Sequence, residues 1–506
     1  MKNTAFLLML LTIVSKLIGF GRDITLSYFY GASNISDAYL ISLTIPLSIF
    51  AFIGTGIATS YIPIYNLAEK ENGIEKADRF TSNVINFTII ISTIIVIIGL
   101  IFTEPIVKIF ASGFKGETLK IAVMFTRISI WSIYFSSLIY IFKGYLQLKD
   151  QFVVPALIGL PLNFITIIAI FISYRTNILV LSIGSIIATF SQIAIMVPWI
   201  IKKGFKYKFL VDKDSKYIKK LVYLSLPVIL GVSASQINVL IDRTLASRIA
   251  MGGISALNYA NRLNLFVQGI VVISISTAMY PLITKMALKK NIKGFKDSIL
   301  SAINIINILV IPATVGSMIF SKEIVMLLFG RGEFDEQAIT MTAGALFFYS
   351  IGMIGYGIRE ILSKAFYSLQ DTKTPMINAA ISMILNVILN LILSRYLGIG
   401  GLALATSISA IFVSSLLILN LRKKVGPFGM RSVINAFIKI CIAASTMGVI
   451  SKLSFEFFKN VLNINIALMI AIFIGALIYF ILIYIFRIED IINFVSLIQN
   501  KIKKKI

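Results

Sequence analysis

Long apolar stretches recur along almost the whole chain and are separated by short polar connections. A helix needs about 20 mainly apolar residues to cross a lipid bilayer. By this measure the pattern predicts about fourteen spans, at residues 6–30, 36–65, 81–103, 119–147, 152–174, 178–201, 219–250, 255–287, 297–320, 337–368, 375–396, 400–421, 432–453 and 464–487. The expected fold class is therefore an all-α polytopic membrane protein with about 14 transmembrane helices.

The polar connections differ in charge, and this assigns them to one side of the membrane. The connection at 202–220 contains eight lysines and that at 285–296 contains five, and both follow even-numbered spans. The connection after the first span, 31–36, contains neither Lys nor Arg. Because Lys and Arg concentrate in cytoplasmic loops, we expect both termini to be cytoplasmic, with a basic tail at 488–506.

The composition agrees with this class and argues against several functions. Of the 506 residues, 58% are hydrophobic and only 14% charged, whereas about one quarter are charged in soluble proteins. The net charge of +25 comes largely from loop lysines, so no nucleic-acid partner is expected. With no histidine, one cysteine and no Walker phosphate loop, the chain is expected to be a transporter without a cofactor rather than an enzyme.

An internal repeat divides the chain. Asp23-Ile-Thr25-Leu26 in the first span reappears as Asp242-Arg-Thr244-Leu245 in the seventh, and Ile35-Ser36 reappears as Ile254-Ser255. Two six-span copies with the same orientation are expected to be related by an axis along the membrane normal, with a site between them. The expected organisation is an N-terminal lobe at 1–217, a second lobe at 218–425 and two extra helices within 426–487, followed by the tail.

The first span is unusual because Lys16, Arg22 and Asp23 lie among its aliphatic residues. An ionisable side chain at bilayer depth costs a few kcal/mol or more and is tolerated mainly where it faces a bundle interior or a wet cavity. Lys16 and Asp23 are seven positions apart and share a helix face. This span is therefore the first candidate for a functional site.

A second cation is expected to complete that site. Arg262 in the eighth span lies about as deep as Arg22, on the order of 12 Å from the outer end of each span. Arginine's planar fork and the point charge of Lys16 suit a phosphate or diphosphate, so the expected ligand is anionic. Asp23 and Asp37 can hold the cations when the site is empty. The alternative is that Arg22–Asp23 and Asp242–Arg243 are ion pairs that only pin helices together.

Further polar groups also fall within the spans. Arg127, Arg359 and Glu360 are expected to form helix-to-helix pairs or to line a cavity. One carboxylate and three neutral oxygen donors form a set that suits Na⁺ as a coupling ion, namely Asp242, Asn386, Asn390 and Thr406. Asn and Thr in membrane helices also form interhelical hydrogen bonds, so both interpretations remain at this point.

A series of motifs has the order found in one known family. They are Gly19-Phe-Gly-Arg22-Asp23, Tyr30-Gly31-Ala32, Ser36-Asp37-Ala38-Tyr39, Ile45-Pro46, Asn258-Tyr259-Ala260-Asn261-Arg262, Asp371-Thr-Lys-Thr-Pro375 and Gly401-Leu-Ala-Leu-Ala-Thr406. The chain resembles the MurJ (MviN) lipid II flippases, which belong to the multidrug/oligosaccharidyl-lipid/polysaccharide exporter superfamily. The resemblance covers essentially the whole chain and includes the number of spans.

The resemblance implies a flippase of the bacterial inner (cytoplasmic) membrane. Its substrate would be lipid II, the undecaprenyl-diphosphate-linked peptidoglycan precursor, which such a protein moves from the inner to the outer leaflet by alternating access during cell-wall synthesis. The family's headgroup-binding cations would correspond to Lys16, Arg22 and Arg262, with Asp37 as a further carboxylate. Phe50 stands where the family has a cation, and Asn390 where a carboxylate is expected, so the number of cations and the coupling ion remain open.

The resemblance also implies that spans 13 and 14 form a groove for the long lipid tail, and a monomer is the default expectation. Two rival functions remain. A flippase for another polyprenyl-diphosphate glycan, such as a capsule or O-antigen unit, would use the same cations, although the opening motif and spans 13 and 14 favour lipid II. A cation-coupled multidrug exporter would need a cavity rich in carboxylates and aromatic rings, whereas the expected site is net basic.

Overall fold

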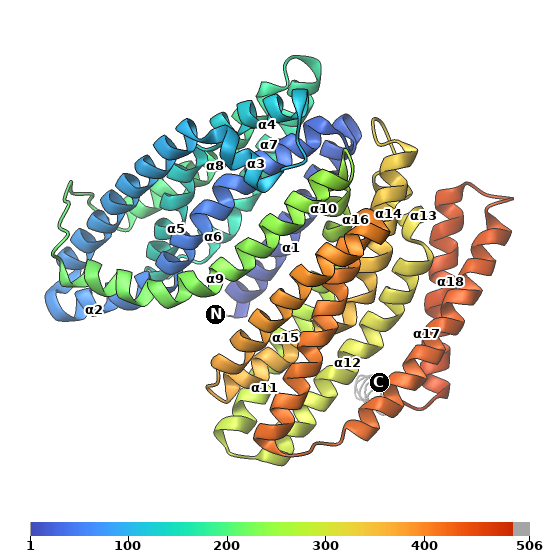
Figure 1. Cartoon of the computed structure of the whole chain (residues 1–506). Coiled ribbons are helices and arrows are strands. Elements are labelled where there is room, and N and C mark those ends of the chain that lie inside the picture. Colours follow the sequence, from blue (N-terminus) through green and yellow to red (C-terminus); the bar gives the residue numbers. More distant parts are fainter. Residues whose placement is uncertain (1, 489–506) are drawn as a thin grey trace. The chain divides into compact units, whose positions relative to one another are not determined.

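The computed structural model describes residues 2–488, and all regular secondary structure in that range is helical (Figure 1). The elements are α1 (Lys2–Tyr30), α2 (Asn34–Ile101), α3 (Thr103–Phe110), α4 (Gly116–Ser129), α5 (Ser132–Leu148), α6 (Val153–Leu157), α7 (Gly159–Arg175), α8 (Leu179–Lys202), α9 (Lys216–Ile249), α10 (Gly253–Val267), η1 (Gln268–Val272), α11 (Ile273–Leu288), α12 (Ile292–Ile319), α13 (Ser321–Leu328), α14 (Glu336–Ile351), α15 (Met353–Ser368), α16 (Lys373–Val425), α17 (Met430–Phe458) and α18 (Ile464–Ile485). The basic tail, from 489 onward, lies outside the described residues.

The two longest helices are hairpins rather than single rods. In α2 the chain reverses near Gly73, which has a φ of 79° and a ψ of 171°. Tyr61 and Thr81 on its two arms share a hydrogen bond of 2.7 Å between their hydroxyl oxygens. In α16 the reversal is near Gly398, with a φ of 55°, and the hydroxyl of Ser382 donates to the carbonyl of Ser409 across the hairpin. Glycine suits both positions because a positive φ strains other residues.

The expected spans all have counterparts among the described helices. Eight helices are long and apolar enough to cross a membrane, or ten if each of two bent pairs counts as one span. The hairpins α2 and α16 each supply two spans, and α1 and α9, with 29 and 34 residues, are also long enough. Counted in this way, the helices provide the fourteen spans of a multi-pass membrane protein. The predicted fold class is confirmed.

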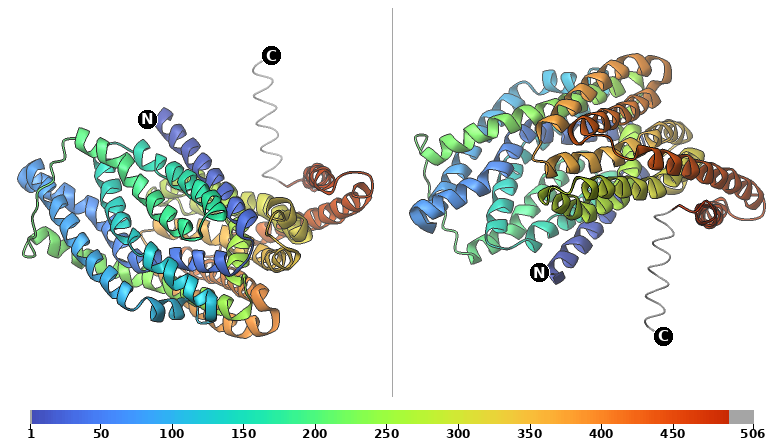
Figure 2. Two further views of the ribbon diagram at one scale, coloured as in Figure 1. Left: turned by 90° about the horizontal axis from the view of Figure 1, so that it is seen from above. Right: turned by 90° about the horizontal axis from the view of Figure 1, so that it is seen from below.

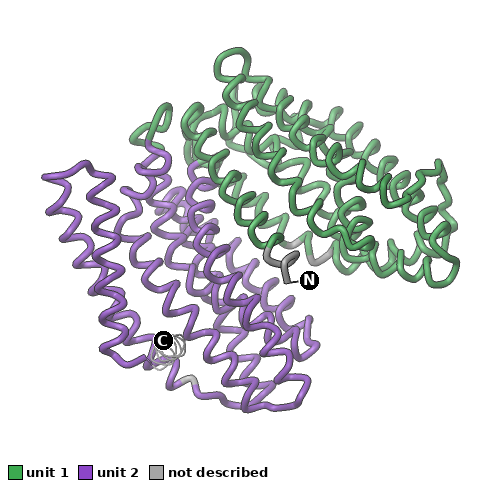
Figure 3. The backbone as a smooth tube through the Cα atoms, turned by 180° about the vertical axis from the view of Figure 1, so that it is seen from behind, with its two compact units in different colours: residues 1–255, 331–338 green, residues 256–330, 339–506 purple. Residues whose placement is uncertain are grey.

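The chain divides into two compact units, coloured separately in Figure 3. Unit 1 comprises residues 1–255 and 331–338, and unit 2 comprises 256–330 and 339–506. Helix α9 belongs to unit 1, where it packs along α2 and α3. The division therefore falls after Ser255, inside α10, and not at the repeat boundary near 217. The predicted lobes describe the repeat, and their boundaries stay a prediction.

The repeat is visible in local structure as well as in sequence. The pair α4 and α5 is bent by 44°, and the pair α14 and α15 by 43°. Both members of each pair match at an interval of 220 residues, since Gly116 corresponds to Glu336 and Leu148 to Ser368. Two positions after the second helix of each pair ends, a residue has a positive φ, namely Asp150 at 57° and Gln370 at 59°. Equivalent sequences therefore produce the same kink and the same helix end.

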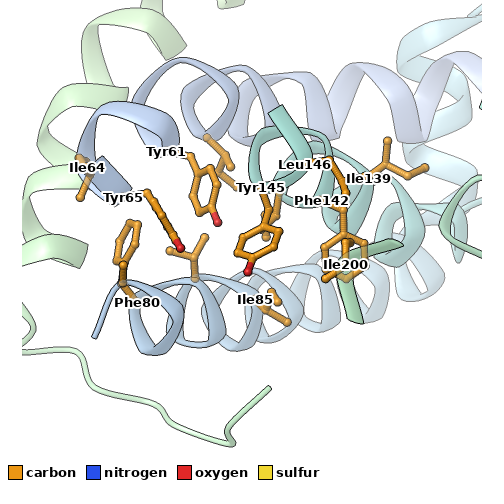
Figure 4. Close-up of a cluster of buried hydrophobic side chains, with 14 of the residues drawn as sticks. Tyr61, Ile64, Tyr65, Phe80, Ile85, Ile139, Phe142, Tyr145, Leu146 and Ile200 are labelled. Atoms are coloured by element: carbon orange, nitrogen blue, oxygen red, sulfur yellow. The ribbon is translucent and has the colours of Figure 1, made fainter. Parts of the chain in front are cut away.

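Each unit has its own apolar core. In unit 1 the arms of α2 pack with α5 and α8 around aromatic side chains, of which Tyr61, Tyr65, Phe80 and Tyr145 are labelled in Figure 4. In unit 2 a core joins η1, α11, α12, α15 and α16. Helices α17 and α18 lie side by side and pack on α12, as the red end of the chain shows in Figures 1 and 2. These two helices are the expected extra pair outside the repeat.

The lysine-rich connection between the repeats is fastened along α2. Asn83 exchanges two hydrogen bonds with the main chain of Asp212, at 2.9 and 3.0 Å. The amide of Asn86 donates to the carbonyl of Leu210 at 2.8 Å. Both asparagines are buried, so their polar groups need these partners. The connection is thus held as an ordered strap in unit 1.

Four segments of unit 1 interlock reciprocally, and we call them the collar: residues 28–37, 109–114, 244–255 and 331–338. A methyl group on Gly113 would lie 2.0 Å from the carbonyl oxygen of Ser247. One on Gly332 would lie 2.2 Å from that of Tyr28. Gly113 and Gly332 are equivalent repeat positions, as are Tyr28 and Ser247. Each copy therefore inserts a glycine loop against the end of the other copy's first helix.

We predict that Gly113→Ala lowers the free energy of unfolding by about 1–3 kcal/mol, because the main chain at Ser247 must move to admit the new methyl group. Thermal unfolding of the purified protein in detergent measures this. The matched control is Gly21→Ala in α1, where no atom lies within 4 Å of the added carbon. Equal melting temperatures for Gly113→Ala and the unmodified protein would contradict the close packing of the collar.

Candidate functional site

Helix α1 carries the first group of candidate residues, and the structure pairs two of them. The Nη2 and Nε atoms of Arg22 donate to Oδ1 of Asp23 at 2.9 and 3.2 Å. The carboxylate is buried, whereas 23% of the Arg22 side chain is exposed. Asp23 thus occupies one edge of the guanidinium, and the edge formed by Nη1 and Nη2 remains for a second anion. The predicted neighbours are paired, as both interpretations of the sequence required.

Lys16 lies on the same helix about one and a half turns nearer its start and is exposed. Helix α7 packs on α1 close to it, since the Asn163 amide donates to the carbonyl of Ser15 at 3.3 Å. Gly19 also faces this amide, and a methyl group there would lie 3.4 Å from it, at ordinary van der Waals distance. The packing holds α1 in place and leaves the Lys16 side chain outside the contact.

Asp37 begins α2 and is 2% exposed, and its partners were not foreseen from the sequence. Its Oδ1 accepts hydrogen bonds from the main-chain N–H and the hydroxyl of Ser255, at 2.7 and 2.6 Å. The hydroxyl oxygens of Ser255 and Ser36 are 2.9 Å apart. Arg243 at the end of α9 donates to the carbonyl of Ile254. Asp37 therefore ties the start of α2 to the start of α10 inside the collar.

Arg262 lies on α10, in unit 2, and is exposed. Six residues later the helix widens into the π-helical turn η1, whose first side chain, Gln268, donates to Oδ1 of the buried Asn264 at 3.1 Å. Single π-helical turns are frequent at functional sites, and no residue pattern in the sequence predicted this one. Because Arg22 belongs to unit 1, the expected pairing of the two arginines across the repeat interface stays a prediction.

The other charged residues predicted within the membrane, Arg127, Arg359 and Glu360, do not share a common contact in the described part of the chain. Arg127 is exposed at the end of α4. The Arg359 guanidinium lies 4.9 Å from the centre of the Tyr356 ring. Glu360 is 3.8 Å from Nζ of Lys364 and accepts a hydrogen bond from Ser276 at 3.5 Å. Of these contacts only the hydrogen bond between Ser276 and Glu360 joins two helices, α11 and α15, and the others lie within α15, so the roles expected for these charges stay a prediction.

Comparisons with known proteins decide the family. Residues 26–473 match the sequence model of a family described as "Lipid II flippase MurJ". A relative from Buchnera aphidicola subsp. Baizongia pistaciae, named "Probable lipid II flippase MurJ", is 31% identical over 415 residues, which are 80% of each chain. A relative of that name from Aquifex aeolicus is 30% identical over 86% of this chain and 85% of its own. The chain belongs to the MurJ family.

Solved structures agree with this membership. One described as "Lipid II flippase MurJ, inward closed conformation" has a TM-score of 0.83 and 29% identity, and covers 95% of this chain and 98% of its own. An inward-facing MATE multidrug transporter has a TM-score of 0.69 at 15% identity, over 83% of this chain and 98% of its own. The similarity to the MATE transporter shows a common fold only. The resemblance inferred from the opening motifs is confirmed.

Phe50 stands at the position that the MurJ family resemblance assigns to a cation. It is 2% exposed and packs in a small core with Val96, Ile130 and Ile133. Its ring centre lies 5.9 Å from that of Tyr140. The Phe50 side chain thus packs in an apolar core along α2 and does not lie in a polar site. The number of cations in any anion site of this chain stays a prediction.

Three of the four residues proposed for Na⁺ form a hydrogen-bonded chain across the α16 hairpin. The Asn390 amide donates to Oδ1 of Asn386 at 3.0 Å, and the Asn386 amide donates to the hydroxyl of Thr406 at 3.4 Å. Asp242 lies on α9, in unit 1. Within the described range no group of three or more His, Cys, Asp or Glu side chains is placed to hold a metal ion. The Na⁺ site stays a prediction.

We predict that Asp37→Ala lowers the free energy of unfolding by about 2–3 kcal/mol, because it leaves the buried N–H and hydroxyl of Ser255 without their acceptor. Asp37→Asn keeps an acceptor oxygen and should cost clearly less. Chemical denaturation in detergent measures both, with the exposed Asp297→Ala as the control. Equal losses for the alanine and asparagine variants would show that these hydrogen bonds do not hold α10 in place.

Proposed function

We propose that this chain is a lipid II flippase that moves the undecaprenyl-diphosphate-linked precursor from the inner to the outer leaflet by alternating access. The observation that carries the proposal is the family match over residues 26–473 together with near-complete coverage of a solved MurJ structure. The protein would act as a monomer in the bacterial cytoplasmic membrane, with both termini on the cytoplasmic side. Its loop charges support that orientation.

The diphosphate would be bound by Lys16, Arg22 and Arg262. Arg22 supports this role because its charge is kept at bilayer depth by the buried Asp23, while one edge of the guanidinium stays open. A diphosphate reaching that edge would share the arginine with Asp23 instead of displacing the carboxylate. Lys16 and Arg262 are both exposed and would add two further positive charges.

The lipid tail would use a cavity within unit 2. It has a volume of about 360 Å³, lies between α12, α17 and α18, and has an almost entirely apolar lining that includes Pro312, Phe320, Met447, Gly448 and Ala476. A hydrocarbon chain can pack against such a lining by van der Waals contact. The cavity supports the groove that the family resemblance implied for these helices.

Transport against a gradient would draw on an ion or on the membrane potential. The polar side chains Asn386, Asn390 and Thr406 and the carboxylate of Asp242 remain the proposed Na⁺ ligands. Asn390 is neutral, so this set carries one negative charge only. We therefore expect weak Na⁺ binding, with the membrane potential as the alternative driving force.

The proposal is tested in a bacterium depleted of its own lipid II flippase. The intact gene should restore growth, and lipid II should reach the outer leaflet in the rescued cells. Rescue without outward lipid II would contradict the proposal. Export of another polyprenyl-diphosphate glycan, with lipid II retained inside, would instead favour the capsule or O-antigen alternative.

We predict that Arg22→Ala or Arg262→Ala abolishes rescue, while the protein still inserts into the membrane. Loss of a charge-assisted hydrogen bond to the diphosphate should weaken headgroup binding about 10- to 100-fold. Arg395→Ala, which removes an exposed arginine from α16, is the matched control and should rescue fully. If either Arg22→Ala or Arg262→Ala rescues as well as Arg395→Ala, the diphosphate assignment is wrong.

We further predict that Ala476→Phe slows lipid II transport, because the new ring fills the cavity between α12, α17 and α18. Leu477→Phe is the control, since that neighbouring side chain is 49% exposed and does not line the cavity. Lipid II translocation is followed in vesicles that contain equal amounts of each protein. Equal translocation rates for the two variants would show that the lipid tail does not use the cavity.

A further inference from the structure

A second, polar hollow lies in unit 2 at the ends of the α16 hairpin, and the transport mechanism above does not use it. Its volume is about 340 Å³. Thr374 and Asn378 line it from the first arm, and Asn420 and Lys423 from the second. The two arms meet here because the hairpin brings the last turns of α16 next to its first turns. The hollow therefore lies where the apolar span gives way to the charged residues that follow it.

One wall of this hollow carries a buried hydrogen-bond donor that is not used. Asn378 is 3% exposed, and its Oδ1 accepts from the amide of Asn420 at 3.1 Å. The Nδ2 of Asn378 has no hydrogen-bond partner in the described part of the chain. A buried donor left unsatisfied is costly, and most such groups in folded proteins have a partner. Asn378 thus contributes to the wall of the hollow and carries a donor without an acceptor among the described residues.

Two charged side chains line the hollow, Lys423 and Lys424, and the second of them is paired. Lys424 is 2.6 Å from Oδ2 of Asp371, which also accepts from Thr374. The Lys424 ammonium and these hydrogen bonds lower the pKa of Asp371 to about 2, so the carboxylate is ionised at neutral pH. Lys423, also at the mouth, forms no ion pair among the described residues. The charges of Lys424 and Asp371 compensate each other, and the positive charge of Lys423 is not compensated.

The lining changes from polar to apolar across the hollow. The ring of Phe366 forms part of the wall, and Ile377, which also lines it, is 53% exposed. A small soluble anion would make no favourable contact with the apolar part of the wall. A group that joins a single negative charge to hydrocarbon would satisfy the lysine, the amide and the apolar wall together.

We propose that this hollow binds the phosphodiester of an anionic membrane phospholipid. A phosphodiester carries one negative charge, which matches Lys423, and its unesterified oxygens can accept from Nδ2 of Asn378. The acyl chains would leave over Ile377 toward the membrane. A free phosphate dianion shares the phosphate chemistry but would bring one charge more than the site neutralises.

The test uses the full-length protein purified in a neutral detergent, and its melting temperature as ligand is added. The probes are short-chain phosphatidylglycerol, short-chain phosphatidylcholine and inorganic phosphate. Phosphatidylglycerol should raise the melting temperature in a saturable way, and the other two should not. Lys423→Gln should need about tenfold more phosphatidylglycerol for the same rise.

Arg422→Gln is the matched control, because it removes the same charge from the neighbouring exposed residue outside the hollow. It should respond like the unmodified protein. Asn378→Asp, of nearly the same size, should also weaken the response by replacing the donor with an acidic group. Similar curves for Lys423→Gln and Arg422→Gln would overturn the site. An equal response to inorganic phosphate or to phosphatidylcholine would overturn the assignment to an anionic lipid.

Discussion

The contact between Asp37 and Ser255 is the constraint on which the arrangement of the first unit depends. Its two short hydrogen bonds involve an acceptor with almost no exposure to solvent, so neither partner has water as an alternative. They fix the start of α10 against the start of α2, next to the glycine loops of the collar. Arg262 lies two helical turns further along α10, in unit 2.

Much of the fold could be predicted because a membrane restricts what each segment can do. Runs of about 20 apolar residues have to become helices, since no water is available to satisfy their main-chain polar groups. The same argument does not reveal that two pairs of spans continue through Gly73 and Gly398 as helical hairpins. Those reversals depend on the conformation of a single residue at each site. The repeat was readable because equivalent sequences end their helices in the same way.

The candidate site was predictable only in part. The charges of α1 stand out against an apolar background, and the structure pairs Arg22 with Asp23. The partners of Asp37 could not be foreseen, because Ser255 is more than 200 residues away and serine is common. The π-helical turn after Arg262 has no sequence signature either. Phe50 illustrates the reverse case, since its departure from the family pattern was visible in the sequence while its packing in the core was not.

The contact between Ser36 and Ser255 shows how the two repeat copies meet inside the collar. Equivalent atoms touch each other only on a two-fold axis, as in the self-complementary contact of a symmetric homodimer. The collar is therefore self-complementary at this point, where one serine of each repeat copy contacts its equivalent in the other. The residue after Ser36 is Asp37, whereas the residue after Ser255 is Ala256. Two carboxylates facing each other there would repel, and with a single carboxylate the local two-fold symmetry is broken where the two equivalent serines meet.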